Sequence, residues 1–187
     1  MTIYKVHADV RHCQSIVFDT DDYLDVLDPS IGEKEAMFLP VVNKSIREHW
    51  SPIELSYFHN KDTVDLADIS IWKSGLLLMN EKAHKSLGAA LNSYGEFLPC
   101  ELHGKPAYIF NALVLKCDGD ANITYATKNG WKQGVASLEF NPTVDEPLFK
   151  LQTEQTFGLF CSEAFKQLCE IGQLKGIYFT ADLTAAL

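Results

Sequence analysis

The sequence predicts an α+β fold in which a few short helices pack on a mostly antiparallel sheet. Short segments rich in Val, Ile, Leu and aromatic residues recur along the chain and are typical of strands. Two segments, 81–91 and 163–171, instead have apolar residues at helical spacing. The order of these elements is irregular, which favours α+β over a repeated βαβ alternation. A length of 187 residues suits one domain.

In the first half of the chain, most of the expected elements are strands. Residues 19–28 could form one short helix, before Pro29 and Gly32 break the chain. A Lys73-Ser74-Gly75 turn should join the last two strands. The expected strands cover residues 3–6, 14–18, 53–58, 69–72 and 76–79.

In the second half, Asn80 is a suitable N-cap for the helix 81–91. Ser162 is expected to cap the helix 163–171, which Gly172 ends. The apolar and small positions at helical spacing in the first helix are Ala83, Leu87, Ala90 and Leu91, and the inward side chains of the second should be Phe165, Leu168, Cys169 and Ile171. Strands are expected at 107–117, the longest one, and at 148–151, 157–160 and 176–179, with a hairpin turn at 118–122.

The chain is acidic, with 16 Lys and Arg against 25 Asp and Glu and a net charge of −9. This balance disfavours binding to nucleic acid or to an anionic membrane, since both need clustered positive charge. The N-terminus lacks the pattern of a signal peptide, and the longest apolar run, residues 76–79, is too short to span a bilayer. We therefore expect a cytoplasmic protein.

The negative charge is concentrated near the N-terminus. Residues 1–36 hold eight acidic and three basic residues, so they carry −5 of the total −9. The simplest interpretation is a solvated segment that keeps the protein soluble. Alternatively, the segment attracts a basic partner, with an intervening aromatic residue as an anchor. The residues concerned are Asp19, Asp21, Asp22, Tyr23 and Asp25.

Motifs for metal or cofactor binding are weak or missing. Cys100 and His103 have the spacing of half a zinc site, but Cys117 is the one further ligand nearby. The Asp-rich turn at 118–122 starts like a calcium loop, yet Ile123 and Asn129 stand where glycine and glutamate are needed. Nucleotide-binding glycine motifs are absent. No metal and no cofactor are expected.

The five cysteines are expected to be free thiols, because their number is odd and no signal peptide is recognisable. Cys161 and Cys169 lie among apolar residues and are expected in the core. Cys13 or Cys100 with a distant histidine could still form a catalytic pair. The tryptophans at 50, 72 and 131 are expected at or near the core.

From Ile71 to Phe179, the order of several short motifs resembles a known family, immunity protein family eleven of bacterial polymorphic toxin systems. This is the swarming-inhibition type, earlier catalogued as a domain of unknown function. Residues 1–70 show no comparable motif and would form a variable part of the same domain, 1–187, with 71–187 as the family-like part. The motif positions are Trp72, Gly75, Phe97, Leu98, Pro99, Phe149, Gly176 and Phe179.

The resemblance implies a non-enzymatic protein that binds a cognate toxin and occludes it. On this hypothesis the toxin is basic and contacts the aspartates of residues 19–25, whereas the matched motif positions are structural. Two alternatives stay open. One is a small hydrolase or transferase that depends on Cys and His; the other is a ligand-binding or scaffold domain without a toxin partner. The oligomeric state is not predicted.

Overall fold

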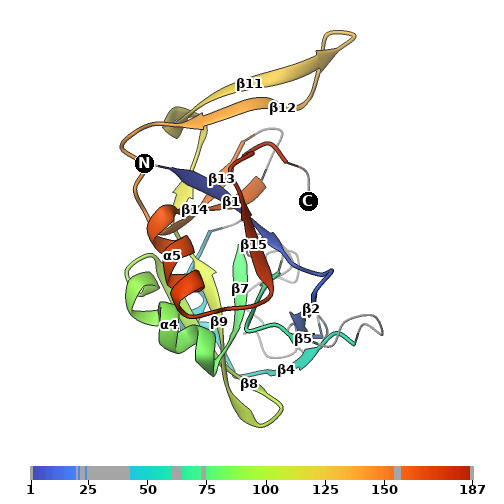
Figure 1. Ribbon diagram of the computed structural model, residues 1–187, viewed down its shortest axis with the longest axis vertical. Helices are drawn as coiled ribbons and strands as arrows, with labels where there is room; N and C mark the ends of the chain where they lie inside the picture. The colour runs from blue at the N-terminus through green and yellow to red at the C-terminus, as the bar shows by residue number, and fades with distance from the viewer. Residues whose placement is uncertain are drawn as a thin grey trace.

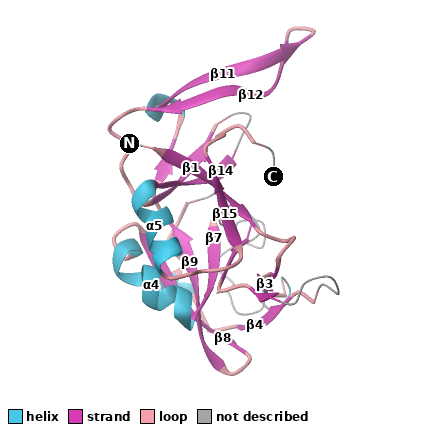
Figure 2. Ribbon diagram, in the orientation of Figure 1, coloured by secondary structure: helices cyan, strands magenta, loops and turns pink. Residues whose placement is uncertain are grey.

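The part of the chain that the computed structural model describes contains two large β-sheets, a short two-stranded pair, two helices and a projecting β-hairpin (Figures 1 and 2). The described residues are 2–19, 21, 24, 43–59, 65–72, 75–153 and 157–185. The helices are α4 (Glu81–Leu91) and α5 (Glu163–Ile171), and the 3-10 turns are η1 (Arg47–His49) and η2 (Asp118–Asp120). The strands are β1 (Ile3–Ala8), β2 (Cys13–Gln14), β3 (Ile16–Val17), β4 (Glu54–Tyr57), β5 (Asp65–Leu66), β6 (Ile69–Trp72), β7 (Leu76–Asn80), β8 (Gly95–Leu102), β9 (Lys105–Ala112), β10 (Leu115–Lys116), β11 (Ala121–Lys128), β12 (Trp131–Phe140), β13 (Leu148–Gln152), β14 (Phe157–Ser162) and β15 (Ile177–Thr180).

The first sheet joins the two ends of the chain. Its strand order is β10-β13-β14-β1-β15, so the N-terminal strand lies between two strands from the C-terminal quarter. β1 is antiparallel to both of these neighbours. The Tyr4 hydroxyl also donates a hydrogen bond of 2.5 Å to the Glu163 carboxylate at the start of α5.

The second sheet has the order β3-β4-β8-β9-β7-β6. Its central strands β8 and β9 form a hairpin that is closed by His103 and Gly104, both with positive φ (52° and 69°). Two successive residues with positive φ are typical of a type I′ turn, whose twist matches that of the flanking strands.

The main core lies between the two sheets, and both helices contribute to it. Along β7, β9 and β14, alternate residues face this core and are apolar. The helices add apolar residues at helical spacing. A second core of nearly the same size and a third, small one cover the outer faces of the sheets. The buried members of the main core are Val6, Ile69, Leu77, Met79, Ala83, Leu87, Leu91, Phe110, Ala112, Leu148, Leu159, Cys161, Phe165, Cys169 and Ile177.

Gly176, just before β15, packs closely against the backbone at the start of β6. It has a φ of 109°, and a Cβ atom there would lie 2.1 Å from the carbonyl oxygen of Ile69 and 2.6 Å from the Cβ of Ala67. Only glycine fits such a position without a backbone shift. This close packing against the β6 backbone gives Gly176 a structural role.

The predicted α+β class is confirmed, and the helices 81–91 and 163–171 have the expected bounds. The sheets, however, are mixed: β2 with β5, β4 with β8, and β10 with β13 run parallel. The expected strand 107–117 is divided between β9 and β10. Residues 118–120 form a 3-10 turn rather than a hairpin turn, because the Asp120 carboxylate accepts a hydrogen bond from the Cys117 N–H at 2.9 Å.

The two helix caps differ from one another. The Asn80 side chain accepts a hydrogen bond from the Ala83 N–H at 3.0 Å, as expected of an N-cap. The Ser162 side chain forms no such bond, and its hydroxyl is buried without a partner. Ile171, expected to point inward, is 80% exposed, since it is the last residue of α5.

Candidate functional site

The structure describes two of the five residues of the acidic segment that were predicted to contact a partner. Asp19 and Asp21 follow β3 and are exposed, and the Asp21 N–H donates to the Asp19 carboxylate at 2.8 Å. Asp22, Tyr23 and Asp25 lie outside the described residues. Exposed carboxylates at the two described positions are available for a partner.

The positions that carry the family resemblance are mostly packed. Leu98 and Phe149 are fully buried, and Trp72 lies 4.5 Å, centroid to centroid, from Phe18. Phe97 and Phe179 are partly buried in the main core, and Gly75 is buried beside β7.

Pro99 is exposed and lies in the middle of β8. A proline is tolerated there because β4 pairs with β8 only at Glu101 and Leu102, so Pro99 has β9 as its partner on one side alone. Its carbonyl accepts a hydrogen bond from the Trp50 indole at 2.9 Å.

Four of the five cysteines offer little to a nucleophilic mechanism, whereas the fifth, Cys117, is exposed and its thiol donates to the Asp120 carboxylate at 3.6 Å. Cys13, Cys100, Cys161 and Cys169 are buried. Burial raises the pKa of all four thiols, to about 12 at Cys100 and Cys169. A thiol with a raised pKa is a poor source of thiolate. His12, next to Cys13, is exposed and pairs with Asp9 at 2.7 Å.

The half-site at Cys100 and His103 is not completed. The Cys100 side chain lies in a core on one face of the six-stranded sheet, where its thiol donates to the carbonyl of Leu98 at 3.6 Å. His103 instead stacks on Tyr57. Within the described residues, no three His, Cys, Asp or Glu side chains are placed to hold a metal ion together.

The β11–β12 hairpin, here called the arm, projects from the body of the protein (Figure 1). Its strands are antiparallel from the pair Ala121–Phe140 to the pair Lys128–Trp131, with irregular register on both sides of Tyr125 and Ala126. Asn129 and Gly130 close it with φ of 54° and 79°, as in a type I′ turn. Among the described residues, neither arm strand pairs with a third strand.

The base of the arm is fixed to the body by aromatic packing. The ring of Phe140 meets Phe149 and Phe160 edge to face, at centroid distances of 5.0 and 5.1 Å. Leu138 packs on the same small core. The root of the arm is therefore held by the five-stranded sheet, whereas its outer part is left in solvent.

The tip of the arm combines aromatic and basic side chains. Trp131 is 77% exposed, contrary to the prediction of a core or core-edge position. Trp50 and Trp72, in contrast, are partly buried against the core as expected. Lys128 is exposed, and the Lys132 ammonium lies 4.3 Å from the ring centroid of Tyr125. The arm thus presents an exposed aromatic and cationic tip.

The arm was missed in the sequence because its apolar residues are sparse. Ile123, Tyr125, Val135 and Leu138 alternate with small and polar residues, a weak strand signal. The pair Asn129-Gly130 was the available signal: this dipeptide between two alternating segments is a strong indication of a hairpin.

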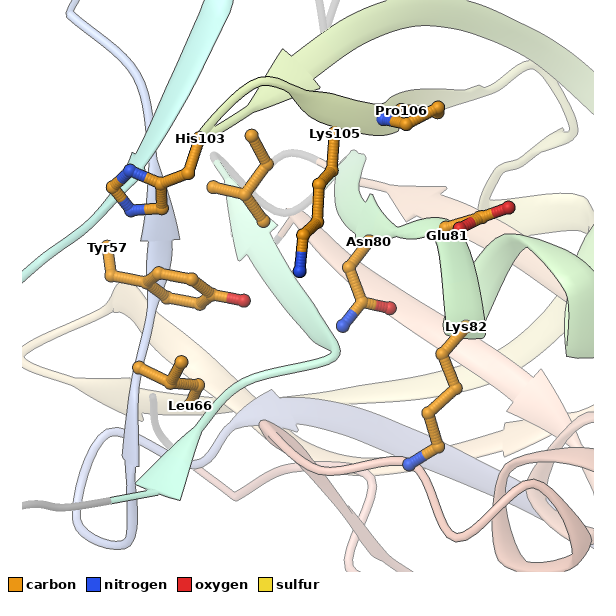
Figure 3. A pocket seen from close by; sticks show the side chains of 9 residues that line it. Tyr57, Leu66, Asn80, Glu81, Lys82, His103, Lys105 and Pro106 are labelled. Carbon is orange, nitrogen blue, oxygen red and sulfur yellow. The ribbon is translucent and has the colours of Figure 1, made fainter.

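A second candidate site is a cavity of about 270 Å³ at the end of the molecule opposite the arm (Figures 1 and 3). The β8–β9 turn forms one wall, and the start of α4 forms another. The side chains of Tyr57, Asn80 and Lys105 point toward one another, whereas the Glu81 carboxylate points away (Figure 3). The lining residues are Tyr57, Leu66, Asn80, Glu81, Lys82, Leu102, His103, Lys105 and Pro106.

Most charged groups at this cavity already have partners. Lys82 binds the Asp68 carboxylate at 2.8 Å, and Glu81 binds Lys85 at 2.6 Å. Burial raises the pKa of the Tyr57 hydroxyl, with Asp68 adding to the effect. The hydroxyl therefore stays protonated at neutral pH, and it donates to the carbonyl of Ala67 at 3.2 Å.

None of the helices in the described part of the chain has the length and apolar character needed to cross a lipid bilayer. No protein-family model matches the sequence, and no curated protein is similar to it at a significant level.

Proposed function

We propose that the protein is a cytoplasmic immunity protein that binds a cognate bacterial toxin and neutralises it by covering a functional surface of the toxin. The order of motifs from Ile71 to Phe179 supports this proposal, because it resembles immunity protein family eleven. In this proposal the protein acts by binding and catalyses no reaction.

The projecting arm carries the proposal. An isolated two-stranded hairpin is only marginally stable in water, so the outer part of the arm adds little to the stability of the protein. We infer that the arm serves to contact a partner. Tryptophan is enriched among the residues that dominate binding energy, and Trp131 is 77% exposed at the tip, where a partner can cover it. Lys128 and Lys132 flank it and favour an acidic recess on the toxin.

Burial of the thiols supports binding over catalysis. The proposed Cys and His hydrolase needs Cys13 or Cys100 as an accessible thiolate, and both are buried with raised pKa values. This geometry weighs against that alternative.

The acidic segment is a separate candidate contact. Asp19 and Asp21 follow β3, which lies toward the end of the molecule opposite the arm (Figure 2). The two surfaces are far enough apart for their contributions to be measured independently. A basic region of the toxin would face these aspartates.

The test is co-expression with a polymorphic toxin domain encoded beside the gene of this protein. We expect a stable complex after purification and rescue of growth in cells that produce the toxin. Trp131→Ala should weaken the complex by a factor of ten or more, measured by calorimetry. Phe58→Ala is the matched control, since Phe58 is an aromatic residue that is 64% exposed at the end of β4. Equal losses in both variants, or no complex, would contradict the proposal.

Replacing Asp19, Asp21, Asp22 and Asp25 with Lys tests the acidic segment. We expect weaker binding and a smaller dependence of the affinity on salt. Unchanged affinity would remove this segment from the interface but leave the proposed function intact.

A further inference from the structure

The cavity beside the β8–β9 turn has features of a small-molecule site and lies away from the proposed toxin-binding arm (Figures 1 and 3). Its lining comes from several separate segments: β4, β5, the β7–α4 junction and the β8–β9 hairpin. Pockets that bind small ligands are typically concave and mostly apolar, with a few polar groups that converge.

The apolar part of the lining is formed by Leu66, Leu102, Pro106 and the ring of Tyr57. Leu66 is 50% exposed, so its side chain would lose contact with water when an apolar ligand enters. Tyr57 is held from behind by His103, whose ring stacks on it at a centroid distance of 5.8 Å. These walls suit a flat or branched hydrocarbon group.

The polar part of the lining is cationic. Lys82 is paired with Asp68, whose other oxygen accepts from the Asn80 amide at 2.8 Å. Lys105 extends into the cavity (Figure 3), and within the described residues its ammonium forms no hydrogen bond or ion pair. Among the described residues, the Glu81 carboxylate acts on Lys105 electrostatically, but that carboxylate is itself bound to Lys85, so Lys105 is less engaged than Lys82 and is the better placed of the two to serve a ligand.

The position of Lys105 is fixed by the chain rather than by a partner. It follows the turn residues His103 and Gly104 directly and starts β9, where it pairs with Leu102. The Glu81 carboxylate, which would repel an anion, points away from the cavity and binds Lys85 at 2.6 Å. The local charge therefore favours an anionic group near the Tyr57 hydroxyl.

We propose that this cavity binds a small monocarboxylate with an aromatic or branched apolar body. The carboxylate would accept hydrogen bonds from Lys105, beside the Tyr57 hydroxyl, and the apolar body would lie against Leu66, Leu102 and Pro106. A volume of about 270 Å³ suits a ligand with one ring. This site is independent of the arm and of toxin binding.

The test uses phenylacetate and phenylacetamide, two probes of the same shape of which only the first is charged at neutral pH. Each is titrated into the ¹⁵N-labelled full chain and followed by NMR. We expect phenylacetate to bind at least ten times more tightly than the amide, with the largest shifts at Tyr57 and His103–Lys105. Equal affinities, or shifts centred elsewhere, would overturn the proposal.

Lys105→Met is the second part of the test, because it removes the charge and keeps most of the side-chain volume. We expect this variant to bind phenylacetate no better than phenylacetamide, while its spectrum outside the turn matches that of the wild type. Lys128→Met, at the tip of the arm, is the control and should keep the wild-type preference. A Lys105→Met variant that still prefers the carboxylate would also overturn the proposal.

Discussion

The two-sheet body and the arm use the same kind of hairpin for different ends. Both the β8–β9 hairpin and the β11–β12 hairpin are closed by two residues with positive φ, His103-Gly104 and Asn129-Gly130. β8 and β9 lie inside a six-stranded sheet and bury Leu98, Ile109 and Phe110 completely. The outer part of the arm buries no comparable residue and exposes Trp131. The hairpin of the body thus contributes buried apolar surface to the core, whereas the outer part of the arm leaves its side chains exposed.

The largest expected difference between the two regions concerns their glycines. Gly176→Ala in the body should lower the free energy of unfolding by about 4 kcal/mol, since the added Cβ meets the Ile69 carbonyl at 2.1 Å. Gly130→Ala in the arm has open space around it and should cost about 1 kcal/mol, from its positive φ alone. Urea unfolding measures both. Similar losses in the two variants would show that the arm is as tightly integrated as the body.

The next effect concerns Lys150, which is fully buried in β13. Burial lowers the pKa of its ammonium from 10.5 to about 8. Between these values the unfolded chain binds more protons than the folded one, so this residue makes the protein more stable as the pH rises from 8 to 10.5. The stability of the wild type relative to Lys150→Met should therefore increase by about 3 kcal/mol over that range.

Urea unfolding of both proteins at several pH values tests this prediction. Lys116→Met is a suitable control, because Lys116 is a partly exposed lysine that is paired with Glu146 at 2.5 Å. A constant difference between wild type and Lys150→Met from pH 8 to 10.5 would mean that Lys150 remains charged in its buried position.

A smaller effect is expected at the N-cap of α4. Asn80→Ala removes the hydrogen bonds to the Ala83 N–H and to the Asp68 carboxylate and should cost about 1–2 kcal/mol. Asn92→Ala at the exposed C-terminal end of the same helix should cost about 0.5 kcal/mol or less. Thermal unfolding compares the two. Equal costs would indicate that the cap contributes nothing specific.

The smallest effect on stability is expected at the tip of the arm. Trp131→Ala should change the free energy of unfolding by less than about 0.5 kcal/mol, because the side chain is 77% exposed. The same substitution should nevertheless weaken toxin binding strongly. A loss of stability above about 1 kcal/mol in urea unfolding would mean that Trp131 has a packing role instead.

The elements that could be predicted from sequence are those whose pattern is set by the core. The spacing of Ala83, Leu87 and Leu91 defined α4, and the dense apolar residues of β7 and β14 defined those strands, because a buried face needs a regular apolar period. The arm escaped prediction because its outer half buries no face. Trp131 was placed in the core by its residue type alone, which says nothing about a projecting hairpin.

The cavity could not be predicted for a different reason. Its lining residues are spread from Tyr57 to Pro106, and no two of the segments that contribute them form a recognisable motif. Their meeting depends on the parallel pairing of β4 with β8, a non-local contact that local periodicity does not encode. The acidic segment was visible from charge counting, but charge density alone does not identify a partner.

The position of β1 between β14 and β15 also has a consequence for the synthesis of the protein. Tyr4 and its partner Glu163 are separated by 159 residues, so β1 cannot pair with β14 or β15 until the roughly 150 residues that follow it have been made. At ordinary rates of translation this delay is roughly 10–30 s. During that time the apolar face of β1 is without its native cover, and chaperones or rapid completion of the chain would protect it.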